Sequence, residues 1–327
     1  MTHSYHDMDI GKEVLRAAQR LHGHVYQTRL DYSPYFSQLT GANVYFKLEN
    51  LQQTGSFKAR GALNKLLSLT EAERQQGVVT ASSGNHGTAV SYGLSRLGMN
   101  GVVFVPENAS PTKVEAIRRY GAEVRFHGHD SGITEIYARR YAAEHDLVYV
   151  SPYNDPLVVA GQGTIGLEIS NQLEQVDAVF VSLGGGGLIG GIGGYLKAVA
   201  PAAQIIGCSP ENSKVMAESV AAGEILDLES LPTLSDGTAG GVEPGSITFD
   251  LCRTLVDAFP TVTEAEIAAA MRQFMATHHM LIEGAAGVAI AALLQNPAPF
   301  VGKNVVVVLC GANISLPTLQ TVLGGES

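Results

Sequence analysis

Short apolar runs alternate with longer segments of helical periodicity along most of the chain. Strands are predicted where β-branched and aromatic residues gather, and helices where apolar residues recur once per helical turn. The predicted strands are residues 43–49, 78–81, 101–105, 123–126, 177–181, 204–208 and 304–309. The predicted helices begin near residue 57 and at 88–97, 111–120, 131–145, 264–278 and 284–294. The alternation predicts an α/β fold with helices on both faces of doubly wound, mostly parallel open sheets.

Two domains are expected from the length and the pattern together. The run 304–309 is uninterrupted and apolar, which is typical of a parallel strand buried on both faces. A chain of 327 residues can form two cores, yet no linker rich in Pro, Gly or Ser divides it. We therefore expect two domains that share one cleft, a large one from 1–53 and 155–327 and a small mobile one from 54–154. No regulatory domain is expected after the last strand.

Composition and charge exclude several functional classes. The net charge of −10 argues against non-specific nucleic-acid binding. No apolar stretch is long enough to span a membrane, and residues 1–7 lack the features of a secretory signal. Cys208, Cys252 and Cys310 are widely spaced and odd in number, which fits a reducing cytoplasm without disulfides or zinc. We expect a cytoplasmic protein with a small-molecule ligand.

The stretch 54–64 contains the first candidate for chemistry. It follows a predicted strand, and Ser56 is expected to cap a helix whose first turn carries Lys58. A lysine in this place is either solvated or has a lowered pKa that makes it a nucleophile toward an aldehyde. This segment alone does not distinguish a solvated lysine from a nucleophilic one. Three later loops supply the observations that do.

Each of these loops follows a predicted strand. In residues 82–87 a turn at a helix N-terminus can hold a carboxylate or phosphate, although an ordinary tight turn would look the same. Four consecutive glycines, 184–187, form the tetraglycine loop, and their entropic cost suggests a phosphate close to the backbone. No Gly-Lys-Ser/Thr follows, so the loop is not a P-loop. Cys310 is either an inert buried thiol or a weak hydrogen-bond partner for a ring nitrogen.

Ligands of open α/β sheets collect at the carboxyl ends of the strands, where Lys58 and all three loops are expected. A lysine, a phosphate cradle and a polar contact for a ring nitrogen in one crevice describe an aldehyde cofactor that carries a phosphate. Pyridoxal 5'-phosphate is the simplest candidate.

The sequence resembles the fold-type II pyridoxal-phosphate enzymes, in the branch of the serine/threonine dehydratases and serine racemases. The resemblance covers the chain from about residue 28 onward, and it implies a fold like that of the tryptophan synthase β subunit, with the active site between the domains. Its motifs are Ser56–Ala62, Ser82–Gly87, Ala160–Thr164, the tetraglycine loop and Cys310–Asn313.

The resemblance also implies a role for individual residues. Lys58 would form the internal Schiff base, act as the catalytic base and be joined in catalysis by Ser83. The substrate carboxylate would lie among Ser82, Ser83 and His86. The cofactor would be bound by Phe57, Lys58, Asn85, Gly184, Gly185, Gly186, Gly187, Leu188 and Cys310.

The activity implied is that of a lyase that converts a small β-hydroxy amino acid, L-threonine or L-serine, to a 2-oxo acid and ammonia. A 3-hydroxyaspartate dehydratase stays open, as does a racemase in which Ser83 is a second base. A non-enzymatic amino-acid-binding protein on the same scaffold is the alternative outside catalysis. The resemblance further implies a homodimer.

Two features depart from the family pattern, and Glu283 is a further candidate. Ser209 and Val215 stand where relatives carry the acidic ligands of a divalent metal, so no such metal site is expected, although a monovalent ion held by carbonyls stays open. The segment 235–245 continues in an unusual way around Glu243, and we expect substrate specificity or a flexible surface loop there. Glu283 is either close to the cofactor or simply an acidic residue at a helix N-terminus.

Overall fold

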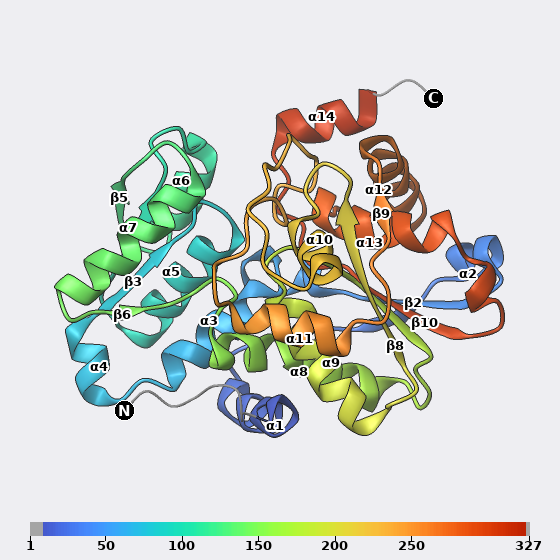
Figure 1. Cartoon of the computed structure of the whole chain (residues 1–327), viewed down its shortest axis with the longest axis horizontal. Coiled ribbons are helices and arrows are strands. Elements are labelled where there is room, and N and C mark those ends of the chain that lie inside the picture. The colour runs from blue at the N-terminus through green and yellow to red at the C-terminus, as the bar shows by residue number, and fades with distance from the viewer. Residues whose placement is uncertain (1–8, 325–327) are drawn as a thin grey trace.

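The computed structural model describes residues 9–324, which form two sheets with helices packed around each (Figure 1). The strands are β1 Leu30–Tyr32, β2 Asn43–Lys47, β3 Val78–Ala81, β4 Gly101–Val105, β5 Glu123–Phe126, β6 Val148–Tyr149, β7 Ala178–Ser182, β8 Gln204–Pro210, β9 Thr261–Val262 and β10 Asn304–Val308. The larger sheet has the order β1-β2-β10-β7-β8-β9, and the smaller has the order β5-β4-β3-β6. Residues 1–7, in which no secretory signal is expected, lie outside the described residues.

Parallel pairing dominates both sheets. Among the strands of residues 9–324, only β1 runs antiparallel to its neighbour, β2, while the other paired strands are parallel. Parallel neighbours need crossover connections, which here are the helices predicted between the strands. The predicted α/β class with mostly parallel open sheets is confirmed.

The helices cover both faces of each sheet. Their bounds are α1 Ile10–Leu21, α2 Pro34–Thr40, α3 Lys58–Leu67, α4 Glu71–Gln76, α5 Asn85–Leu97, α6 Pro111–Arg118, α7 Ser131–Glu144, α8 Pro156–Gln172, α9 Gly187–Val199, α10 Val215–Ala222, α11 Ile247–Leu255, α12 Glu264–His278, α13 Gly284–Gln295 and α14 Leu316–Gly324, with short 3-10 helices η2 Glu49–Leu51, η3 Gln53–Gly55 and η4 Ala298–Phe300. In Figure 1, α12 and α13 lie on one side of the larger sheet, and α8 and α9 on the other. Within residues 9–324, no helix has both the length and the apolar character required to cross a bilayer.

The apolar run 304–309 forms the centre of the larger sheet. Strand β10 pairs in parallel with β2 on one side and β7 on the other, with Val306 opposite both Tyr45 and Val179. Residues 305–308 are completely buried. Helices on both faces remove these side chains from water, and this burial is the main stabilising term of a parallel sheet.

The two sheets draw on different parts of the chain. All strands of the smaller sheet lie within 54–154, and all strands of the larger sheet lie within 1–53 and 155–327. Helix α3, which carries Lys58, packs against α8 of the larger unit and α5 of the smaller one. This arrangement supports the expected domain boundaries, which stay a prediction.

The start of α3 differs from the expectation. Ser56 does not cap the helix: its backbone is extended and bridges to Gly311, and its buried hydroxyl has no hydrogen-bond partner. Helix α3 begins at Lys58, with Phe57 as the residue before it. The extended backbone at Ser56 results from pairing with the end of the larger sheet, a long-range contact that local propensity does not encode.

Candidate active site

A cleft of about 890 Å³ lies between the two units, at the carboxyl ends of their strands. Every site residue predicted from the sequence lines this cleft. They are Phe57, Lys58, Ser82, Ser83, Asn85, His86, Gly184, Gly185, Gly186, Gly187, Leu188 and Cys310. The predicted convergence of Lys58 with the three loops is therefore present in the structure.

Lys58 is the first residue of α3 and reaches into the cleft. Its amino group donates a hydrogen bond to the carbonyl oxygen of Pro152 at 2.8 Å and lies 5.2 Å from the centre of the Phe57 ring. Burial lowers the pKa of Lys58 from 10.5 to about 8. At neutral pH, more of this amine is uncharged than in a solvated lysine, and the uncharged amine is the nucleophile.

The lysine segment is joined directly to the loop that contains Cys310. The Phe57 N–H donates to the Cys310 carbonyl oxygen at 3.0 Å. Next to this bond, Ser56 and Gly311 form an antiparallel bridge. Two stretches more than two hundred positions apart in the chain are thus fixed side by side by backbone bonds, which hold Lys58 near the end of β10.

The turn 82–87 connects β3 to α5, which begins at Asn85 and so places His86 in its first turn. The Ser82 hydroxyl accepts from the Gly84 N–H at 3.1 Å, which fixes the turn. Burial, with a smaller effect of the charge on Lys58, lowers the pKa of His86 to about 3. The neutral ring donates from Nε2 to the Val150 carbonyl at 3.1 Å, and its Nδ1 is a buried acceptor without a partner among residues 9–324.

The tetraglycine loop connects β7 to α9, and protein atoms crowd its backbone. A Cβ atom at Gly184 would lie 2.9 Å from the backbone of Thr238. One at Gly185 would lie 2.6 Å from the ring of Tyr153, and Gly186 adopts a φ of +82°. Close approach of other protein segments therefore explains part of the glycine content that the sequence alone attributed to a phosphate. The loop also exposes the N-terminal N–H groups of α9, which have no acceptor inside the helix.

Asn85 and Glu283 form a polar pair at the base of the cleft. The Asn85 amide nitrogen lies 3.0 Å from both carboxylate oxygens of Glu283, and the Asn313 N–H donates to the same carboxylate at 3.2 Å. The Cys310 thiol lies 3.8 Å from the carboxylate. Burial raises the pKa of Glu283 to about 7, and it raises the pKa of the Cys310 thiol well above its ordinary value. The Glu283 side chain turns to these partners and does not cap α13.

These residues fit pyridoxal phosphate. The cleft combines an amine of lowered pKa on Lys58, a glycine cradle at the N-terminus of α9 and a neutral thiol at Cys310. Within the part of the chain that the structure describes, the buried Nδ1 of His86 has no hydrogen-bond partner, so a ligand in the cleft could supply one. A phosphate suits the helix N-terminus, and a neutral thiol suits a ring nitrogen that is not forced to bind a proton.

The sequence did not single out several residues that also line the cleft. They are Glu135 and Arg139 of α7, and Tyr153, whose ring lies against the tetraglycine loop. The segment 235–245, which the sequence marked as unusual, forms part of the same wall. No motif could have indicated Arg139, because its partner in this segment lies 104 positions away.

The structure adds an observation on metal binding. Ser209 lies in β8, and its hydroxyl donates to the Leu183 carbonyl at 3.3 Å. Among residues 9–324 no group of three or more His, Cys, Asp or Glu side chains is arranged to bind a metal ion.

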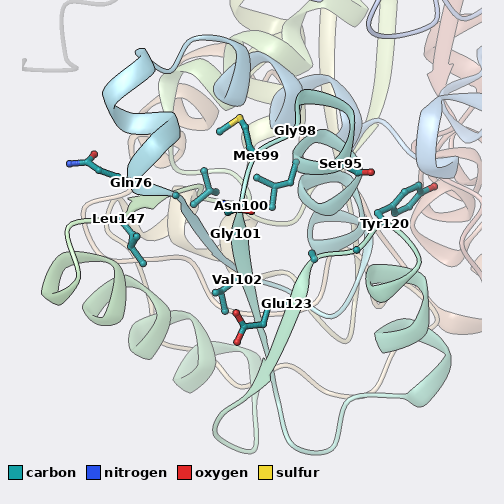
Figure 2. Close-up of a pocket in the computed structure, with 15 residues that line it drawn as sticks. Gln76, Ser95, Gly98, Met99, Asn100, Gly101, Val102, Tyr120, Glu123 and Leu147 are labelled. Carbon is teal, nitrogen blue, oxygen red and sulfur yellow. The ribbon is translucent and has the colours of Figure 1, made fainter.

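A second hollow, of about 580 Å³, lies at the end of the smaller sheet that is opposite to the cleft (Figure 2). Gly101 and Val102 line it at the start of β4, together with Glu123 at the start of β5 and Leu147. These are the amino ends of the strands, whereas the turn 82–87 leaves the carboxyl end of β3. This hollow is separate from the cleft that contains Lys58.

Comparison with known proteins places the chain among similar sequences and structures. Residues 21–311 match the family described as pyridoxal-phosphate dependent enzyme. The chain is 39% identical over 325 residues to the catabolic L-threonine dehydratase of Escherichia coli, covering 98% of each. It is similar to the processed form of threonine deaminase isoform 2 of Solanum lycopersicum, with a TM-score of 0.89, 31% identity and coverage of 96% and 93%. It is also similar to the serine racemase of Dictyostelium discoideum, with a TM-score of 0.86, 34% identity and coverage of 93% and 98%.

Proposed function

Because the chain belongs to the family of pyridoxal-phosphate-dependent enzymes, we propose that it is an ammonia-lyase. Its substrates are small β-hydroxy amino acids, L-threonine and L-serine first, and its products are a 2-oxo acid and ammonia. The observation that carries this proposal is Lys58: a partly buried amine with a pKa of about 8 lies in one cleft with the tetraglycine loop and the turn 82–87. An amino-acid-binding protein without catalysis would not need such an amine.

The residues that hold the cofactor follow from the site. Lys58 would be the point of covalent attachment, and Phe57 would line the cleft beside it. The tetraglycine loop and Leu188 would hold the phosphate at the N-terminus of α9. Asn85 and Cys310 would supply polar contacts. Once bound, pyridoxal phosphate supplies the electron sink that makes the α-proton of an amino acid acidic.

Residues of the protein carry out the remaining steps. Ser82, Ser83 and the backbone N–H of His86 bind the substrate carboxylate at the N-terminus of α5. The Lys58 amine would remove the α-proton as general base. The β-hydroxyl leaves with a proton as water, and hydrolysis of the released product gives ammonia and the 2-oxo acid.

A panel of substrates tests the proposal. Purified enzyme is incubated with L-threonine, L-serine and the 3-hydroxyaspartate isomers, and 2-oxo acid, ammonia and D-isomer are each assayed. We expect 2-oxo acid and ammonia in equal amounts from L-threonine, and an absorbance band near the visible edge that Lys58→Ala removes. Wild-type enzyme without the band would refute the cofactor site, and wild-type enzyme that has the band but forms no 2-oxo acid would refute the lyase.

Racemisation is the second candidate, because a serine occupies position 83 in the cleft and a serine racemase is among the similar structures. A serine on the other side of the substrate from Lys58 would act as the second base. In this case Ser83→Ala abolishes formation of the D-isomer and retains 2-oxo acid formation. Equal inversion by the variant and the wild type excludes the role of Ser83.

We also propose a cytoplasmic homodimer with a small mobile domain at 54–154. The resemblance to the dehydratases and racemases implies the dimer, and the separation of the two sheets along the chain supports the mobile unit. Sedimentation equilibrium tests the dimer, and a mass equal to that of one chain would refute it.

A further inference from the structure

The segment 235–245 crosses from the larger unit to helices of the smaller one. Asp236 pairs with Lys113 of α6 at 2.6 Å, and Glu243 pairs with Arg139 of α7 at 2.6 Å. The two ion pairs differ in their surroundings. Lys113 and Asp236 are both exposed, whereas Arg139 and Glu243 are each about one quarter to one third exposed. The second pair is therefore the one in which charge is weakly screened.

Arg139 lies between two carboxylates. Its Nη2 is 2.8 Å from Glu135 Oε1 and 2.6 Å from Glu243 Oε2, and its guanidinium stacks over the Tyr149 ring at 4.4 Å. One guanidinium and two carboxylates leave this cluster with one net negative charge. A further carboxylate that approached Arg139 would meet two like charges, so Arg139 cannot act as an anion site while both partners are ionised.

The cluster lies close to the reacting lysine. The Pro152 carbonyl accepts a hydrogen bond from Lys58. The next residue, Tyr153, accepts a hydrogen bond from the Glu243 N–H through its hydroxyl, at 2.9 Å. The Asn154 side chain donates to the Glu243 carboxylate at 2.8 Å. The charge on Glu135 acts on Lys58 itself, where it favours the protonated form. The cluster thus lines the same cleft as Lys58.

We propose that Glu243 is a specificity-determining residue, which adds a second negative charge beside Arg139 and makes the cleft reject β-hydroxy amino acids whose side chain ends in a carboxylate. This inference rests on the proposed ammonia-lyase function. Without Glu243, the guanidinium would face only the Glu135 carboxylate, and the second carboxylate of 3-hydroxyaspartate could take the place of Glu243 as its other partner. With Glu243 in place, the cleft accepts uncharged side chains such as those of L-threonine and L-serine.

The test compares the ratio of kcat/KM for threo-3-hydroxy-L-aspartate to that for L-threonine in wild-type enzyme, Glu243→Gln and Asp236→Asn. Removal of one charge close to a bound carboxylate should raise this ratio about tenfold or more in Glu243→Gln. Asp236→Asn is the matched control, because it loosens the same segment and leaves Arg139 paired. An unchanged ratio in Glu243→Gln, or an equal rise in Asp236→Asn, would overturn the inference.

A binding measurement separates this inference from the lyase proposal. L-Aspartate lacks a β-hydroxyl, so its dissociation constant can be measured by calorimetry on the holoenzyme whether or not the lyase reaction occurs. We expect about tenfold tighter binding by Glu243→Gln than by the wild type, and loss of this gain when Arg139→Gln is added. Equal affinity of the wild type and Glu243→Gln would overturn the inference even where L-threonine is deaminated. A wild type that leaves L-threonine unchanged would refute the lyase alone.

Discussion

The Asn85 amide donates to both carboxylate oxygens of Glu283 at 3.0 Å, although the two residues lie 198 positions apart in the chain. Asn85 begins α5 on the smaller unit, and Glu283 precedes α13 on the larger one. The pair therefore bridges the cleft at its base. Because burial outweighs these hydrogen bonds, the carboxyl keeps its proton to higher pH than a solvated glutamate, with a pKa of about 7.

Glu283→Gln should change how the stability of the apoprotein depends on pH. The folded carboxyl has a pKa of about 7 and the unfolded one a pKa near 4.5, so between these values only the folded state holds the proton. The contribution of Glu283 to stability is thus fully present below about pH 4.5 and is lost as the pH rises toward 7.

The measurement is the thermal midpoint of wild type and Glu283→Gln between about pH 4.5 and 8. The midpoint of the variant should fall less with rising pH than that of the wild type. Glu211→Gln, at an exposed position, serves as the control. Parallel curves for the wild type and Glu283→Gln would contradict the assigned pKa.

Lys58 should capture pyridoxal phosphate in the apoprotein with an unusual pH profile. Only the uncharged amine attacks an aldehyde, so the rate should rise with a midpoint near pH 8 and not near 10.5. Stopped-flow absorbance follows the reaction, and borohydride reduction with peptide mapping identifies the modified lysine. Lys58→Ala should abolish capture, and Lys65→Ala should retain it. A midpoint near 10 would show that burial does not lower this pKa.

The elements that the sequence predicted best are those whose pattern reflects one local environment. Strand β3 and helix α12 have the predicted bounds, because β-branched residues between turn signals and a capped amphipathic helix are local signals. Helix α8 was missed as an element although its motif at 160–164 was noticed. It is buried on nearly all sides, so it lacks the alternation of polar and apolar faces that identifies a helix.

The residues of the candidate site likewise divide into those that the sequence could predict and those that it could not. Lys58 and the tetraglycine loop could be found because glycine clusters and a lysine after a strand are visible in the sequence. The pairing of Glu243 with Arg139, and of Glu283 with Asn85, depends on contacts between distant segments, and no periodicity encodes these contacts. The sequence marked 235–245 as unusual and Glu283 as a candidate, but it predicted neither contact.

Arg60 should be essential for the fold around Lys58. Its buried guanidinium binds Glu49 at 2.7 and 2.8 Å and Glu168 at 2.6 and 2.9 Å, while Lys47 lies 2.6 Å from Glu168. Arg60→Met leaves the buried Glu49 carboxylate and the largely buried Glu168 carboxylate with one cation, Lys47, which should lower the free energy of unfolding by about 3–5 kcal/mol. Urea denaturation measures this loss.

The exposed Arg96 provides the comparison for Arg60, since its guanidinium donates to a backbone carbonyl at the surface. Arg96→Met should change the free energy of unfolding by less than about 0.5 kcal/mol. Similar losses in the two variants would mean that the buried charges around Arg60 relax or bind protons when it is removed.

Gly185→Ala should weaken cofactor binding by about tenfold or more. The added Cβ would lie 2.6 Å from the Tyr153 ring, so either the ring or the tetraglycine loop must move, and the N–H groups at the start of α9 move with the loop. Gly241→Ala is the control, because nothing lies within 4 Å of its added Cβ in the same cleft. Titration of the apoproteins with pyridoxal phosphate gives the dissociation constants.

Combining Gly185→Ala with Tyr153→Ala should recover affinity relative to Gly185→Ala, because the clash has two partners and removing either relieves it. Wild-type affinity in Gly185→Ala alone would show that the loop adapts without moving its N–H groups.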